Sequence, residues 1–250
     1  LYSGFGINLT KIFEQIQAIP QFDIKSPSSG SYFGGTKNTF IPTLSVTDAD
    51  GDALTCKLYV DSESTPREIR TVTNTKTSQL VSFNTFNAAT LSEGNHTLKF
   101  TVGDSRDTVQ SSINIIVDKT VPITTNVSFS STDNSIVISG KASDSLSGLD
   151  ATPYRFSAGN KSTIWGTNTS AVYDALKPNT LYPVKFEAQD KVGNVAISSG
   201  NIYTKAQTPI ITVKNVSENS IDLTLTDNNP STTMYQIVSP QMPSAQWQTV

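Results

Sequence analysis

Three aspartates form the densest group of candidate metal ligands in this sequence of 250 residues. Asp48, Asp50 and Asp52 alternate around Gly51 in the stretch DADGD. A turn at this point brings carboxylates together, and Ca2+ takes six to eight such oxygen ligands. The EF-hand template fails, because the twelfth position counted from Asp48 is Tyr59 rather than glutamate. Two hypotheses stay open, a plain Asp-Gly turn between strands and a calcium-binding loop. In the calcium hypothesis, extra ligands come from Asp104, Asp107 or Asp118.

The sequence contains one histidine and one cysteine, which restricts nucleophilic and metal chemistry. His96 would serve a Ser-His-Asp triad only in an exposed cleft, yet it falls on the apolar face of an expected strand, which predicts a structural role. A lone Cys56 excludes an intrachain disulfide and a cysteine-based zinc site. Its flanking residues Leu54 and Leu58 place it on an inward face, so we expect a buried, structural thiol.

Two tryptophans, Trp165 and Trp247, are candidates for stacking on sugar rings, because exposed aromatic faces bind carbohydrates in this way. They lie 82 residues apart, at matched positions of a repeated pattern. A residue that recurs in each copy is more simply explained as a packing feature. Carbohydrate binding and packing are therefore both carried forward.

Strands must position these residues, and the clearest one lies within residues 176–190. The turn residues Pro178, Asn179 and Thr180 precede a period-2 alternation that is typical of a half-buried strand. Its inward side chains are Tyr182, Val184, Phe186 and Ala188, and the side chains expected in solvent are Pro183, Lys185 and Glu187. A second copy, HTLKFTVGD from His96, matches at a constant offset of 86 residues. Repetition of a whole domain explains that offset.

The composition limits the class of protein. The chain carries 36% hydrophobic and 16% charged residues, and its length predicts about two domains. A net charge of −3 without a basic run argues against a nucleic-acid partner. No apolar run approaches the roughly 18 to 20 residues of a spanning helix. The chain begins at Leu1 without a signal-peptide pattern, so we expect a segment of a longer protein.

The pattern along the chain divides it into four parts. Residues 1–21 have helical spacing of apolar side chains, which predicts a short helix near residues 10–19 and none after residue 22. Residues 22–120 and 121–207 read as two antiparallel β-sandwiches, and residues 208–250 as an incomplete third one. Strands are expected around residues 44–46, 54–60, 81–83, 96–102 and 113–117 in the first sandwich. In the second they are expected around residues 136–138, 154–156, 171–173, 182–188 and 202–204. The polar residues 61–79 read as a long connection.

Several of these motifs resemble known domain families. LKPNTLY, ending at Tyr182, resembles the tyrosine corner of fibronectin type III and immunoglobulin-like sandwiches, in which the phenol bonds back to the preceding turn. Residues 22–118, with DADGD, LTCKLYVD and LSEGNHTL, resemble Ig-like and cadherin-like repeats of bacterial surface proteins. ASDSLSGLDATPYRFS and AQDKVGNVA look like fibronectin type III or related bacterial repeats. One departure is the tryptophan that many fibronectin type III domains bury on strand B, which would fall near Gly140.

The resemblance implies an all-β, non-catalytic chain of tandem Ig-like and fibronectin type III sandwiches from an extracellular or cell-surface protein. We expect a stalk, spacer or adhesive array, with a surface glycan, a surface protein or neighbouring copies of itself as partners, and Ca2+ as the one cofactor considered. Two alternatives stay open, the accessory modules of a secreted polysaccharide-active enzyme and a phage tail or filament subunit on a virion surface.

Overall fold

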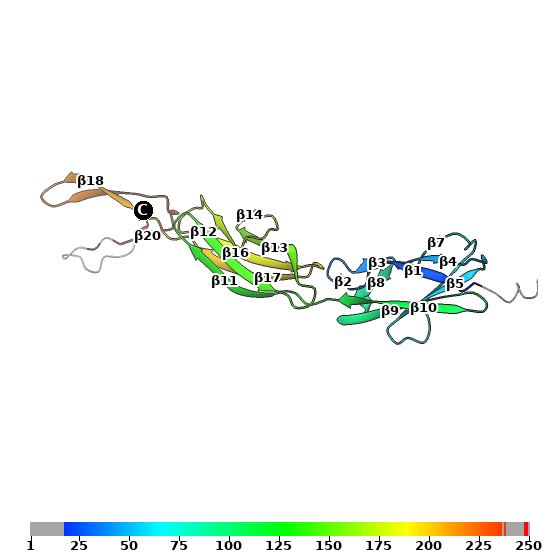
Figure 1. The fold of residues 1–250 in the computed structure, drawn as a ribbon. Coiled ribbons are helices and arrows are strands. Elements are labelled where there is room, and N and C mark those ends of the chain that lie inside the picture. The colour runs from blue at the N-terminus through cyan, green and yellow to red at the C-terminus, as the bar shows by residue number, and fades with distance from the viewer. Residues whose placement is uncertain (1–17, 237, 239–247, 250) are drawn as a thin grey trace, which may run out of the picture. The chain divides into compact units, whose positions relative to one another are not determined.

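A computed structural model describes residues 18–236, 238, 248 and 249 (Figure 1). The chain divides into two compact units, residues 1–120 and 121–250. The helix predicted near residues 10–19 falls mostly outside the described residues, and residues 18 and 19, which are described, are not helical. Trp247 also lies outside the described part. Within the described ranges, no helix is long and apolar enough to cross a membrane.

The first unit is a β-sandwich of two sheets. The smaller sheet has the order β1 (Gln21–Ser26), β4 (Thr43–Thr47) and β7 (Gln79–Ser82). The larger sheet has the order β2 (Ser31–Phe33), β10 (Thr108–Val117), β9 (Gly94–Gly103), β5 (Leu54–Val60) and β6 (Glu68–Val72). Its ladders are antiparallel except that β2 runs parallel to β10. The short strands β3 (Thr39–Phe40) and β8 (Phe86–Asn87) pair separately, and η1 (Ala88–Thr90) is a single 3-10 turn.

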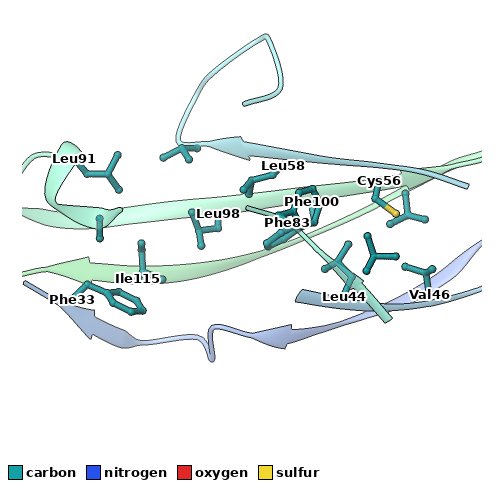
Figure 2. Close-up of a cluster of buried hydrophobic side chains, with 14 of the residues drawn as sticks. Phe33, Leu44, Val46, Cys56, Leu58, Phe83, Leu91, Leu98, Phe100 and Ile115 are labelled. Carbon is teal, nitrogen blue, oxygen red and sulfur yellow. The ribbon is translucent and has the colours of Figure 1, made fainter. Parts of the chain in front are cut away.

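Alternating side chains fill the space between these two sheets. Every second residue of β5 is buried, from Leu54 to Val60, and Phe100 on β9 is fully enclosed. Figure 2 shows side chains of both sheets, including Leu44 and Val46 of β4, pointing into one common core. Each large aliphatic or aromatic side chain enclosed in this way contributes about 1.5–3 kcal/mol to folding. The strands predicted at residues 44–46, 54–60, 96–102 and 113–117 are confirmed.

One stretch of this unit differs from the sequence-based expectation. Residues 61–79 do not form a long connection throughout, because they contain β6, which pairs with β5 from Leu58↔Glu68 to Leu54↔Val72. On this edge strand Ile69 is exposed, whereas Glu68 and Arg70 are joined by an ion pair of 2.5 Å. Val72 is the one apolar residue of β6 that packs against the core, so the usual apolar-inward alternation is incomplete on this strand.

The second unit begins with another β-sandwich. Its three-stranded sheet has the order β11 (Ile123–Ser131), β12 (Ile136–Ser143) and β15 (Ser170–Tyr173). Its four-stranded sheet has the order β14 (Lys161–Ser162), β13 (Leu149–Ala158), β16 (Leu181–Asp190) and β17 (Val195–Tyr203). Every ladder is antiparallel. Ile136 and Ile138 from one sheet pack with Phe156 and Phe186 from the other, and these two rings lie 5.2 Å apart.

Beyond this sandwich, the described residues form only two narrow ribbons. β18 (Ile210–Val216) pairs with β19 (Ile221–Thr226), and β20 (Met234–Tyr235) pairs with β21 (Gln248–Thr249). All seven residues of β18 are exposed, including Ile210 and Val216. In the described part of residues 208–250, therefore, no closed two-sheet core is present.

Candidate functional site

The tyrosine of the repeated strand closes the turn before it. Tyr182 lies near the start of β16, and its hydroxyl accepts a hydrogen bond of 2.9 Å from the backbone N–H of Lys177. The Thr204 hydroxyl donates to the carbonyl of Lys177 at 2.6 Å and accepts from the N–H of Thr180 at 3.0 Å. The bond between the Tyr182 hydroxyl and the backbone of Lys177 is the contact expected of a tyrosine corner. The corner holds the chain where it enters the central strand of the four-stranded sheet.

His96 occupies the corresponding place in the first unit. It lies near the start of β9, only 7% exposed, and its Nε2 is 3.0 Å from the carbonyl oxygen of Ser92. Its Nδ1 is 2.8 Å from Oδ2 of Asp61, which also accepts from the N–H of Thr97 through Oδ1 at 2.9 Å. Burial raises the pKa of Asp61, but its hydrogen bonds with His96 and Thr97 outweigh that effect and hold the pKa below its usual value.

The same group contains the residue types of a catalytic triad. The Ser92 hydroxyl is 3.3 Å from Nε2 of His96, and Asp61 lies on the other side of the ring. However, Nε2 also faces the backbone carbonyl of the same serine, at a shorter distance. A base that activates a serine needs that nitrogen free for the hydroxyl proton and needs an open approach for substrate. The buried ring of His96 instead ties a turn to two strands.

Cys56 lies on β5 with no exposed surface. Burial raises the pKa of its thiol to about 11. The protonated thiol therefore dominates near neutral pH, and it is a weak nucleophile. Figure 2 shows the sulfur among the aliphatic side chains of the core.

Trp165 lies beside an ion pair whose carboxylate is buried and whose guanidinium is partly exposed. The guanidinium carbon of Arg155 is 4.7 Å from the centre of the Trp165 ring. Arg155 donates to Glu187 through Nε at 2.6 Å and through a terminal nitrogen at 2.9 Å. Glu187 is only 5% exposed, so its expected place among solvated side chains was wrong, because Arg155 covers it. The Arg155 hydrogen bonds outweigh burial and lower the pKa of Glu187.

Sugar stacking by Trp165 and by Trp247 stays a prediction. Trp165 is half-buried and in contact with Arg155, a geometry that a packing role explains. Trp247 lies outside the described residues, so its match to Trp165 is not tested.

The acidic loop after β4 is organised by its first aspartate. Asp48 is 2% exposed, and its Oδ1 accepts from the N–H groups of Asp50 at 2.9 Å and Gly51 at 3.1 Å. Gly51 adopts a φ of 83°, the left-handed conformation that glycine allows. Asp48, Asp50 and Asp52 do not bring three carboxylate oxygens within 4.8 Å of one another. The loop has the geometry of an Asp-Gly turn, and a calcium site built from these three carboxylates stays a prediction.

Some functional contacts were not found by sequence reasoning. The pairing of Arg155 with Glu187 depends on the register between β13 and β16, which places the two residues directly opposite each other. The bond between Asp61 and His96 spans 35 residues of sequence. Alternation within one strand carries no information on either partner, so only the ladder register identifies them.

Comparison with known proteins gives structural matches alone. No family model and no curated protein sequence matches the chain. A structure concerning host cell surface retention of a 1.5-MDa bacterial ice-binding adhesin is 14% identical, with a TM-score of 0.45, over 82% of this chain and 71% of that one. Domains A168–A170 of titin are 12% identical, with a TM-score of 0.43, over 76% and 68%. Fibronectin(III)-like modules of CbhA from Clostridium thermocellum are 15% identical, with a TM-score of 0.39, over 74% and 95%.

The strand order of the second unit decides the fold. Strands β11, β12 and β15 form one sheet and strands β14, β13, β16 and β17 the other, with the tyrosine corner at the start of β16. The chain has the fold of tandem Ig-like and fibronectin type III domains. In this fibronectin-like unit, the backbone of Gly140 lies against Phe186, because a Cβ on Gly140 would be 2.8 Å from that ring. A bulky side chain has no room there, which explains why no tryptophan stands at this place.

Proposed function

We propose that this chain supplies non-catalytic modules to an extracellular surface protein, in which they act as a stalk, spacer or adhesive array. The observation that carries the proposal is that the side chains best suited to catalysis or ligand binding make structural contacts. His96 closes a turn, Cys56 is enclosed in a core, and Trp165 covers the ion pair of Arg155 with Glu187. Each of these side chains is committed to holding a sandwich together.

The mechanical argument rests on how each sandwich is closed. The first and second sandwiches each have their own buried cluster, so each can fold around its own core. Ten-residue central strands, β9 and β16, are each paired on both sides within their sheets. Repetition of such units adds length to a protein without requiring a new fold. This property suits a spacer between an anchor and a binding or catalytic module.

The partners we propose are a glycan or protein of a neighbouring surface, or further copies of this chain. The composition is compatible with that setting. The single cysteine is buried, and the net charge of −3 is spread over a chain with 18 basic and 21 acidic residues.

The test is protease treatment of intact source cells, followed by immunodetection of this chain. The proposal expects the label on unpermeabilised cells and its loss after the treatment. Label only after permeabilisation would overturn it. Release into the medium together with retention on insoluble polysaccharide would favour accessory modules of a secreted enzyme. Label on purified virions would favour a tail or filament subunit.

A further inference from the structure

Two buried carboxylate oxygens of the first sandwich have no hydrogen-bond donor. They are Oδ2 of Asp48 and Oδ2 of Asp104. In each residue the other oxygen is well satisfied: Oδ1 of Asp104 accepts from the N–H groups of Arg106 at 2.6 Å and Asp107 at 2.7 Å. Burying a charged oxygen without a donor or a cation is costly. Each aspartate therefore presents one oxygen that is held in place and lacks a partner.

The two aspartates occupy the same end of the sandwich. Asp48 directly follows β4, and Asp104 directly follows β9. Gly103 pairs with Thr55 on β5, so Asp104 lies just beyond the start of that ladder, beside the loop that leads from Asp48 into β5. The residues come from different sheets, and both lie at the end of the sandwich where residues 48–53 cross from one sheet to the other.

The second sandwich brings its two corresponding positions together. Asp144 directly follows β12 and Asp190 ends β16, so they correspond to Asp48 and Asp104. Carboxylate oxygens of Asp144 and Asp190 lie within 4.8 Å of each other. In that sandwich Oδ2 of Asp190 receives a donor, the side-chain amide of Asn194 at 2.8 Å. Asn194 lies four residues after Asp190, and the residue four positions after Asp104 is Thr108. Oδ2 of Asp104 has no donor like the amide of Asn194.

The charges carried by the two loops favour a cation, although the side chain of Lys76 lies over Gly51 in the first loop. Asp48 lines an open cavity of about 500 Å3 together with Thr47, Gln21 and Lys76. Although Lys76 lines the same cavity, Oδ2 of Asp48 has no hydrogen bond from it. The two loops carry one lysine or arginine of their own, Arg106, against five carboxylates: Asp48, Asp50, Asp52, Asp104 and Asp107.

The loop is also held in place before any ligand binds. The N–H of Asp48 donates to the carbonyl of Thr75 at 2.8 Å, and the Thr75 hydroxyl donates to the carbonyl of Asp52 at 2.6 Å. Thr75 itself is fully buried. A site on such a loop loses little conformational freedom when it binds a ligand.

From these observations we propose that Asp48 and Asp104 bind a hard divalent cation, Ca2+ by its preference for carboxylate oxygens. Their Oδ2 atoms are the protein's charged ligands, and backbone carbonyls and water complete the coordination. This ligand set differs from the one predicted from the sequence, which was built on Asp48, Asp50 and Asp52. Oδ2 of Asp50 accepts from the N–H of Ala18 at 2.5 Å, so this oxygen already has a donor, unlike Oδ2 of Asp48 and of Asp104. The proposal does not depend on the extracellular role proposed above.

The first test measures stoichiometry by equilibrium dialysis of the full chain against CaCl2, at about 1 mM as suits sites of extracellular modules. The variants are Asp48→Asn and Asp104→Asn, each of which keeps the shape of the side chain. The matched control is Asp23→Asn, because the Asp23 carboxylate is 77% exposed in the same unit. We expect each test variant to bind one Ca2+ fewer than the wild type and the control to bind the same number. Equal numbers in all four proteins, or no binding by the wild type, would overturn the proposal.

A second measurement needs no variant, so misfolding cannot obscure it. Amide NMR spectra of the wild-type chain are recorded during titration with CaCl2 alone and with MgCl2 alone. We expect Ca2+ to shift the amides of residues 48–52 and 104–107 together, at lower concentration than Mg2+. Shifts confined to other residues, or no shift in these loops, would contradict the site.

Discussion

The hydroxyl of Tyr182 and the backbone N–H of Lys177 are joined by a hydrogen bond of 2.9 Å that closes the turn before β16. Replacing Tyr182 by phenylalanine keeps the ring and removes only the acceptor. A typical net hydrogen bond stabilises a protein by about 1 kcal/mol, so Tyr182→Phe should lower the free energy of unfolding by that amount. Urea denaturation, followed through the unfolding transition of the second unit, measures this change in free energy. Tyr203→Phe is the control, because Tyr203 is 60% exposed. An unchanged stability in Tyr182→Phe would show that this hydrogen bond does not stabilise the turn.

The ion pair beneath Trp165 should respond unequally to loss of its members. Arg155→Leu leaves the buried Glu187 charge without its bidentate partner, and we expect a loss of about 1–3 kcal/mol, less than for a fully buried pair because Arg155 is partly exposed. Lys185→Leu is the control, because its Nζ lies 4.0 Å from Glu187 on the exposed side. Chemical denaturation of both variants compares them. Equal stabilities would show that Arg155 is not the essential partner of Glu187.

The close approach of Gly140 to Phe186 predicts a steric effect. A methyl group at residue 140 would lie 2.8 Å from the ring of Phe186, which is fully buried and has little room to move. Gly140→Ala should therefore destabilise the second sandwich by about 1–3 kcal/mol, as overpacked cores do. Gly166→Ala is the matched control, because nothing lies within 4 Å of its added methyl group. A Gly140→Ala protein that melts like the control would contradict the packing described.

Stability should fall on acidification, and the sign follows from two carboxylates. The pKa of Glu187 is lowered by its hydrogen bonds with Arg155, and that of Asp61 is lowered on balance by His96 and Thr97. Because these pKa values are lower in the folded protein, the unfolded chain binds protons at a higher pH than the folded chain does. The stabilisation is complete above the unfolded pKa values of about 4.3 and 3.9 and is lost as pH falls through the folded ones.

The measurement is the free energy of unfolding between neutral pH and pH 3. We expect Glu187→Gln to flatten the acid limb of the second unit's transition and to leave that of the first unit unchanged. Asp61→Asn should do the reverse. If neither substitution changes the acid limb of its own unit, these carboxylates are not the groups that couple stability to pH.

The sequence predicted strands where one face of the sheet is apolar and the other solvated. Residues 54–60 alternate without a break, and residues 182–188 follow the same pattern except at the buried Glu187. β6 was missed because Ile69 faces solvent and its neighbours pair through charges, so the apolar period is incomplete. The donor for Glu187 and the partner of His96 were missed for another reason: both depend on contacts between strands, which no single stretch of sequence contains.

The central claim is that the chain is a series of separately closed sandwiches, and stretching single molecules of the full chain tests it most directly. The account predicts two successive unfolding events, each releasing about 300 Å of chain for a sandwich of roughly 100 residues. Gly140→Ala should lower the force of one event and leave the other unchanged. A single event that releases the whole length, or a Gly140→Ala effect on both events, would contradict the account.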